Sequence, residues 1–65
     1  MATETQKSNY TSALALIAKA KTESELHRVE QIITNVYDAT NDLTAQQFAR
    51  LCDKICDRLE RFWAQ

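Results

Sequence analysis

The sequence predicts an all-α fold: a three-helix bundle built on an antiparallel helical hairpin. None of its 65 residues is glycine or proline, on which tight turns and β-hairpins usually depend. Apolar residues recur at steps of three and four along most of the chain, which is the spacing of one helix face. Thr22 and Thr44 are each followed three residues later by a Glu or Gln, a pattern typical of a helix start. We therefore expect helices over about 8–21, 23–40 and 45–63, in a single domain that spans residues 1–65.

The first expected helix is apolar around much of its circumference. Its main apolar face consists of Tyr10, Leu14, Ile17 and Ala18. Leu16 lies almost opposite Leu14, and a helix that is apolar on several sides is usually buried on more than one of them. The start of this helix is open, because three residues can each serve as its N-cap: Thr3, Thr5 and Ser8. A start at Ser8 leaves residues 1–7 as a disordered segment.

The second expected helix begins after Thr22. Thr22 and Glu25 form a predicted capping box, and the acidic side chains of Glu23 and Glu25 complement the positive end of the helix dipole. The seam of this helix consists of Leu26, Val29, Ile33, Val36, Tyr37 and Thr40. Ile32 lies outside the seam. We expect the helix to end at Asn41, which tolerates the left-handed backbone conformation that glycine usually supplies.

The third expected helix carries the most complete start signal. Thr44 and Gln47 can form a capping box, and Leu43 and Phe48 stand where a hydrophobic staple closes across the first turn. The seam that follows consists of Phe48, Leu51, Cys52, Ile55, Leu59, Phe62 and Trp63. A connection of about three residues joins this helix to the second one, so the two should form an antiparallel hairpin. We expect the first helix to cover the groove between them.

Composition limits the classes of function that the chain can have. A domain of this length buries only about 60% of its unfolded surface, so its stability is marginal without further support. Charges of both signs are interspersed and the net charge is −1, which argues against a basic nucleic-acid arm and against an acidic disordered tail. No apolar run approaches the length of a membrane span, and the first residues are polar, unlike a secretory signal. We expect a soluble cytoplasmic protein that does not associate with membranes.

The residue pattern indicates no catalytic site, no cofactor and no metal site. Cys52 and Cys56 lie one helical turn apart, and with the single histidine, His27, they are too few for a structural zinc site within one chain. An intersubunit metal site stays open as an alternative. We expect two reduced thiols, one buried and one at the edge of the core. His27 is expected on the solvated flank of its helix, and Glu30 in a salt bridge to a lysine or arginine of a neighbouring helix.

Two sets of residues are candidates for binding. The first is an apolar set that we expect to form a partner or oligomer interface: Leu16, Ile32, Phe62 and Trp63. Leu16 and Ile32 lie off the helix seams, and Trp63 stands near a chain end, where full burial is difficult. The alternative is that a loosely packed bundle encloses them. The second set is a basic row that could contact nucleic-acid phosphates: Arg50, Lys54, Arg58 and Arg61. Acidic residues beside this row cancel much of its field, which favours surface ion pairs over DNA binding.

Two resemblances bear on the context of the protein. The chain contains the segments Ala20-Lys21-Thr22-Glu23-Ser24-Glu25-Leu26 and Leu43-Thr44-Ala45-Gln46-Gln47-Phe48, the latter followed by Leu51. Together they resemble a helical-hairpin pattern common in small proteins of bacteriophages and other mobile elements, which implies a context more than an activity. A second set is similar in order to residues of the Hha/YmoA family of nucleoid-protein partners: Tyr10, Thr22, Leu26, Arg28, Val29, Leu43, Thr44, Ala49, Arg58 and Leu59. This second resemblance implies a nucleoid protein as partner.

These observations predict a small accessory or regulatory protein of phage or mobile-element type that has no enzymatic activity. It would act by helix-mediated binding to a host or phage protein and by self-association into a homo-oligomer. The alternative is a DNA-binding or nucleoid-associated transcriptional regulator that uses the basic flank of the third helix.

Overall fold

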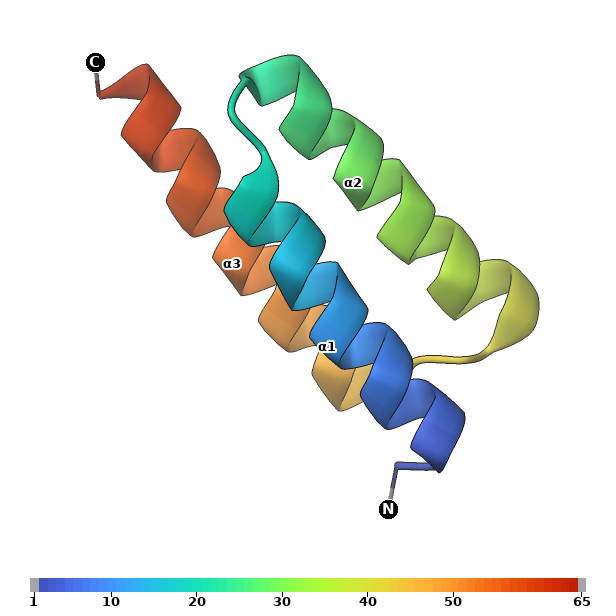
Figure 1. The fold of residues 1–65 in the computed structure, drawn as a ribbon. Coiled ribbons are helices and arrows are strands. Elements are labelled where there is room, and N and C mark those ends of the chain that lie inside the picture. The colour runs from blue at the N-terminus through green and yellow to red at the C-terminus, as the bar shows by residue number, and fades with distance from the viewer. Residues whose placement is uncertain (1, 65) are drawn as a thin grey trace.

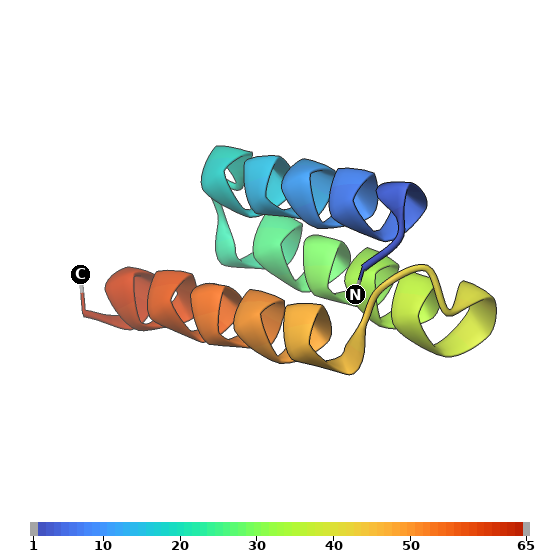
Figure 2. The same cartoon turned by 90° about the horizontal axis from the view of Figure 1, so that it is seen from below.

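The computed structural model describes residues 2–64, which form three α-helices and one short π-helix. The elements are α1 (Glu4–Lys19), α2 (Glu23–Asn35), η1 (Val36–Thr40) and α3 (Ala45–Trp63). In Figure 1, α2 runs antiparallel to both α1 and α3, and η1 continues α2 into the turn that leads to α3. Each α-helix contacts the other two, so that α1 lies against both members of the α2–α3 hairpin (Figure 2). The predicted all-α three-helix bundle is confirmed.

The first helix begins earlier than Ser8, the start that the predicted range assumes. Its N-cap is Thr3, whose hydroxyl accepts from the backbone N–H of Gln6 at 3.1 Å. The amide oxygen of Gln6 accepts in return from the backbone N–H of Thr3 at 2.9 Å, which completes a capping box. Because the box satisfies two otherwise unpaired backbone donors, it extends the helix back to this point. The first turn of α1 thus falls within segment 1–7, which a start at Ser8 would have left disordered; Met1 lies outside the described residues.

The C-terminal end of α1 is held by a side chain from α3. The helix ends at Lys19 rather than Lys21, because Ala20 has an extended backbone conformation. Ala20 is 4% exposed, and its carbonyl oxygen accepts from Nη2 of Arg58 at 2.6 Å. A guanidinium thus occupies one of the carbonyl groups that a helix end leaves unpaired.

The capping box predicted at the start of α2 forms only in part. The hydroxyl of Thr22 accepts from the backbone N–H of Glu25 at 3.1 Å, as predicted. The Glu25 carboxylate does not close the box onto Thr22; it accepts from the backbone N–H of Lys21 at 2.7 Å. This charge-assisted bond ties the helix start to the connection that precedes it.

The second helix widens before it ends. The sequence predicts an α-helix up to Thr40, but regular α-helix ends at Asn35 and residues Val36–Thr40 form a single π-helical segment. The carbonyl oxygen of Val36 accepts from the Thr40 hydroxyl at 2.7 Å and from the backbone N–H groups of Asn41 and Asp42. Asn41 has the predicted left-handed conformation, with φ 59° and ψ 25°. The bond from Asn41 spans five residues, which is the pattern of the wider π-helix.

Polar side chains of α1 fix the turn between η1 and α3. The amide nitrogen of Gln6 donates to the carbonyl oxygen of Asn41 at 3.3 Å, and that of Asn9 donates to the carbonyl oxygen of Asp42 at 3.1 Å. The next residue, Leu43, is 2% exposed. The turn is therefore anchored on its polar backbone by α1 and on its apolar side chain by the core.

The start of α3 is the predicted one. Thr44 and Gln47 form a complete capping box, with both hydrogen bonds at 3.0 Å. Phe48, in the first turn, stacks on Tyr37 of η1 with ring centroids 4.4 Å apart and planes 5° from parallel. This stack joins the two ends of the hairpin connection.

Ten buried apolar residues form the core. They are Ala13, Ile17, Ala20, Leu26, Val29, Ile33, Leu43, Leu51, Ile55 and Leu59. Three members of the predicted seams are exposed instead: Ala18, Thr40 and Trp63. Ala13 replaces Ala18 because α1 faces both other helices, which rotates its buried stripe toward Ala13 and Ile17.

Replacing Ile55 with Ala should lower the free energy of unfolding by about 2–5 kcal/mol, enough to unfold most of a domain of this size. Ile55 is 2% exposed, so its removal leaves a cavity between helices. The matched control is Ile32→Ala at a position that is 46% exposed, where we expect a loss below about 1 kcal/mol. Urea unfolding followed by circular dichroism measures both losses. Equal losses would show that Ile55 does not lie on the buried face of α3.

Candidate functional site

Two of the four predicted interface residues lie together on the surface between α1 and α2. Leu16 of α1 is 40% exposed and Ile32 of α2 is 46% exposed. Both residues line the same two neighbouring grooves. The smaller groove has a volume of about 110 Å³, and buried core residues such as Ala13 and Ile33 form its floor. We call Leu16 and Ile32 the α1–α2 patch.

Charged residues of both signs border this patch. The larger groove, with a volume of about 290 Å³, is lined by Lys19, Glu25 and Arg28 in addition to Leu16 and Ile32. The rim therefore carries two positive charges and one negative charge around an apolar centre. An apolar centre with a charged rim is the usual composition of a protein–protein interface.

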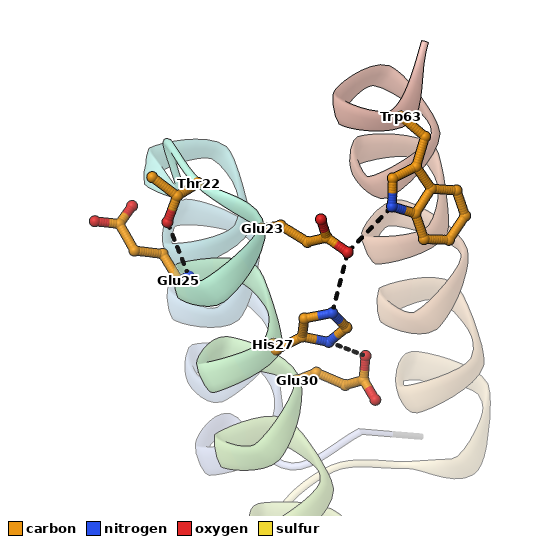
Figure 3. A network of polar contacts seen from close by, with 6 residues as sticks. All are labelled: Thr22, Glu23, Glu25, His27, Glu30 and Trp63. Carbon is orange, nitrogen blue, oxygen red and sulfur yellow. Dashed lines mark hydrogen bonds and ion pairs between the residues drawn. The ribbon is translucent and has the colours of Figure 1, made fainter. Parts of the chain in front are cut away.

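Trp63, the third predicted interface residue, lies over the start of α2. Its side chain is 65% exposed, yet its indole Nε1 donates to Oε1 of Glu23 at 3.1 Å. The same oxygen lies 3.6 Å from Nε2 of His27, and Nδ1 of His27 lies 3.9 Å from Oε2 of Glu30 (Figure 3). His27 is exposed on its helix flank, as predicted. Glu30 faces His27 of its own helix, instead of the basic residue of a neighbouring helix that the sequence predicts.

Phe62, the fourth predicted interface residue, is half-buried against the core. The guanidinium carbon of Arg58 lies 5.8 Å from the centroid of its ring, within cation–π range. The structure thus brings Leu16 and Ile32 together, and it places Phe62 with Arg58 and Trp63 with Glu23.

The basic row of α3 is divided between a structural role and an exposed one. Arg58 is half-buried: besides its bond to Ala20, its Nε is buried without a hydrogen-bond partner among residues 2–64. Arg50, Lys54 and Arg61 are exposed. Arg58 is therefore largely committed to the bundle, whereas the other three members of the row face solvent.

A further groove runs between α1 and α3. Its volume is about 250 Å³, and its lining consists of Leu14, Ile17, Ala18, Lys54, Asp57, Arg58 and Arg61. One wall is therefore apolar and comes from α1, and the other is charged and comes from α3. We call it the α1–α3 groove.

The two cysteines are free thiols in different environments. Both are free; Cys52 is half-buried and Cys56 is exposed, so neither is fully buried as the sequence predicts for one of them. Burial raises the pKa of the Cys52 thiol, and electrostatic interactions with Glu30, Cys56 and Asp53 raise it further. A raised pKa lowers the thiolate fraction, which is the reactive form.

The described residues offer no constellation for metal binding. Within residues 2–64, no three His, Cys, Asp or Glu side chains lie close enough to hold a metal ion together. Cys52 and Cys56 instead line a groove of about 170 Å³ with Glu30 and two core residues. None of the helices over this part of the chain combines the length and apolar character needed to cross a membrane.

Comparison of the chain with protein-family models, with curated proteins and with solved structures finds no match. The class of the protein is therefore defined by its fold and surface: a small helical bundle with apolar and charged grooves between its helices.

Sequence reasoning missed the α1–α3 groove and the bond from Arg58 to Ala20. Arg58 stands beside the seam residue Leu59, on a flank of the helix. This position predicts only that its aliphatic stem lies along the core. The carbonyl group that accepts its hydrogen bond is remote in the sequence, and periodicity carries no signal for it.

Cys52 should react with iodoacetamide several-fold more slowly than Cys56 at about pH 8, because its raised pKa leaves less thiolate and its side chain is half-buried. Alkylation followed by peptide mass spectrometry measures the two rates in one sample. In denaturing urea the two rates should converge. A native Cys52 that reacts as fast as Cys56 would contradict the half-buried environment of its thiol.

Arg58→Met should lower the free energy of unfolding by about 1–3 kcal/mol, because it removes a charged donor from the end of α1 while it keeps an unbranched stem. Arg50→Met is the matched control on the exposed part of the row, and we expect a change below about 0.5 kcal/mol. Thermal unfolding of both variants measures the two changes in stability. Equal stability would mean that Arg58 does not support α1.

Proposed function

We propose that the protein is a non-enzymatic binding module that associates with a second copy of itself and with a protein partner through its helical surface. The observation that carries this proposal is the α1–α2 patch. Leu16 and Ile32 stay exposed because the core takes up only ten apolar residues. Within residues 2–64, no further helix is present to cover them. Covering such a patch in a dimer adds the apolar burial that a small domain lacks.

The charges around the patch support self-association in particular. A two-fold axis through an interface places the same surface opposite itself. With Lys19, Arg28 and Glu25 on one rim, Glu25 of each copy can pair with one of the two cations of the other copy. Exposed ion pairs of this kind add little energy, but they select one orientation of the two copies.

The exposed ring of Trp63 is proposed as a second contact, directed to the protein partner. Its indole N–H is already paired with Glu23, so its contribution comes from the apolar ring. Fixed aromatic side chains of this kind are frequent hot spots in protein interfaces. Phe62, near the same end of α3, is proposed to contribute its ring to this contact, next to the guanidinium of Arg58.

We further propose that this is a cytoplasmic accessory or regulatory protein of phage or mobile-element type. This part of the proposal depends on the hairpin pattern that resembles small phage and mobile-element proteins, and on the similarity to the Hha/YmoA family. Both likenesses favour a host or phage protein as partner.

DNA binding by the basic row is the second candidate function. Arg50, Lys54 and Arg61 are exposed on one flank of α3, which favours it. The net charge of −1 and the bond that holds Arg58 against α1 weigh against it. A fluorescent DNA duplex at low salt tests it: salt-sensitive binding that is lost in Arg50→Gln supports this function, and no binding removes it.

The double variant Leu16→Gln/Ile32→Gln should be monomeric where the natural sequence forms a dimer or a larger oligomer. Sedimentation equilibrium across a concentration series measures this. Because both residues are exposed, the helical circular dichroism of the variant should stay unchanged.

Trp63→Gln is the matched control, since it removes an exposed apolar side chain from a different part of the surface. We expect it to leave self-association intact. A natural sequence that stays monomeric up to millimolar concentration would contradict the proposed self-association, and so would equal effects of the two changes.

A further inference from the structure

The α1–α3 groove combines an apolar wall with a basic wall. Leu14, Ile17 and Ala18 form the wall on α1, at positions that share one stripe of that helix. Lys54 and Arg61 contribute exposed cations from α3, and Arg58 lies between them. The groove is distinct from the α1–α2 patch, since the two share no lining residue.

The charge of this groove contrasts with that of the whole chain. Three cationic residues and one carboxylate, Asp57, line it, so the local balance is +2 in a chain whose net charge is −1. The Arg58 guanidinium is used in part by the bundle, so Lys54 and Arg61 are the groups most available to a ligand and Arg58 adds its remaining charge. A binding partner for this surface has to carry negative charge beside apolar groups.

We propose that the α1–α3 groove binds an acidic amphipathic helix of a partner protein. Lys54, Arg58 and Arg61 follow one another at steps of four and three, so they extend for about 10 Å along the axis of α3. A helix laid alongside presents acidic side chains with the same spacing when they occur at positions i, i+4 and i+7. Apolar residues on its adjacent stripe then meet Leu14 and Ala18, which is the helix-in-groove mode of recognition.

The lining favours such a helix over a nucleic-acid backbone. Phosphates gain nothing from the α1 wall, and the Asp57 carboxylate between the cations repels them. An amphipathic helix uses both walls, and the Asp57 carboxylate then fixes where a polar or basic residue of the partner belongs. This inference rests on the proposed function, because it names the chemistry of the protein partner.

The experiment uses the full chain and a labelled helical peptide as probe. The peptide carries Glu at i, i+4 and i+7 beside a stripe of Leu, and a control peptide of the same composition has its Glu residues on the opposite face. Fluorescence anisotropy at low salt should show binding of the first peptide and binding at least about tenfold weaker for the second. Binding of the first peptide should also weaken as salt is added.

Charge reversal locates the binding surface. Lys54→Glu/Arg61→Glu should weaken binding of the first peptide about tenfold or more. Lys7→Glu/Arg50→Glu is the matched control: it makes the same change in net charge at exposed residues outside the groove, and it should have less than about a twofold effect. Arg58 is left unchanged in both, because its substitution disturbs α1.

Three results would overturn the inference: equal losses in the two double variants, equal binding of the two peptides, or no peptide binding at low salt. A duplex DNA that displaces the peptide from the natural sequence, with binding lost in Lys54→Glu/Arg61→Glu, would assign the groove to nucleic acid. Sedimentation of the same variants separates these failures from failure of the proposed function. Self-association that persists in Lys54→Glu/Arg61→Glu shows that the α1–α2 patch still acts when the groove does not.

Discussion

Burial of only ten apolar side chains has to hold three helices together, and the other features of the molecule follow from this limit. Two of the ten are alanines, which bring helices close but bury little area. The largest fully buried side chains are three leucines, Leu26, Leu43 and Leu51. Aromatic residues such as Tyr37 and Phe48 pack at the edge of this core and stay half-buried. A core of this size cannot cover every apolar face of its helices, so some of those faces remain at the surface.

Polar contacts supplement the core at the helix ends. Capping boxes begin α1 and α3, and the guanidinium of Arg58 closes the end of α1. The turn before α3 is held by hydrogen bonds from Gln6 and Asn9 to its backbone carbonyl oxygens. The bonds made by Gln6, Asn9 and Arg58 join segments that lie far apart in the sequence, so they resist separation of α1 from the hairpin. In a chain without glycine, Asn41 supplies the one left-handed residue among residues 2–64.

The local parts of the fold could be predicted because their causes are local. Thr44 and Gln47 are three residues apart, and the capping box between them needs no other part of the chain. The helical periodicity likewise identified Leu51, Ile55 and Leu59 as buried. The start of α1 was open among three caps because each satisfies the same local rule, and only the box with Gln6 distinguishes Thr3. The π-helical segment was not predictable, because it depends on several donors that converge on a single carbonyl oxygen.

The candidate surfaces were predicted less completely. That Leu16 and Ile32 stay exposed follows from their place off the seams, but their meeting in one pair of grooves depends on how α1 packs on α2. The basic row was recognised from spacing alone. Its division into a structural Arg58 and the exposed Lys54 and Arg61 depends on the position of Ala20, which only the tertiary structure fixes.

The resulting molecule has two different faces: an apolar patch with charges of both signs on its rim between α1 and α2, and a basic groove between α1 and α3. The central claim is that the small core leaves the α1–α2 patch to be covered by another molecule. The most direct test is to dilute ¹⁵N-labelled protein and to measure the chemical shifts of its backbone amides by NMR at each concentration. We expect concentration-dependent shifts that cluster around Leu16 and Ile32. Shifts that are absent, or that cluster on the exposed face of α3, would contradict it.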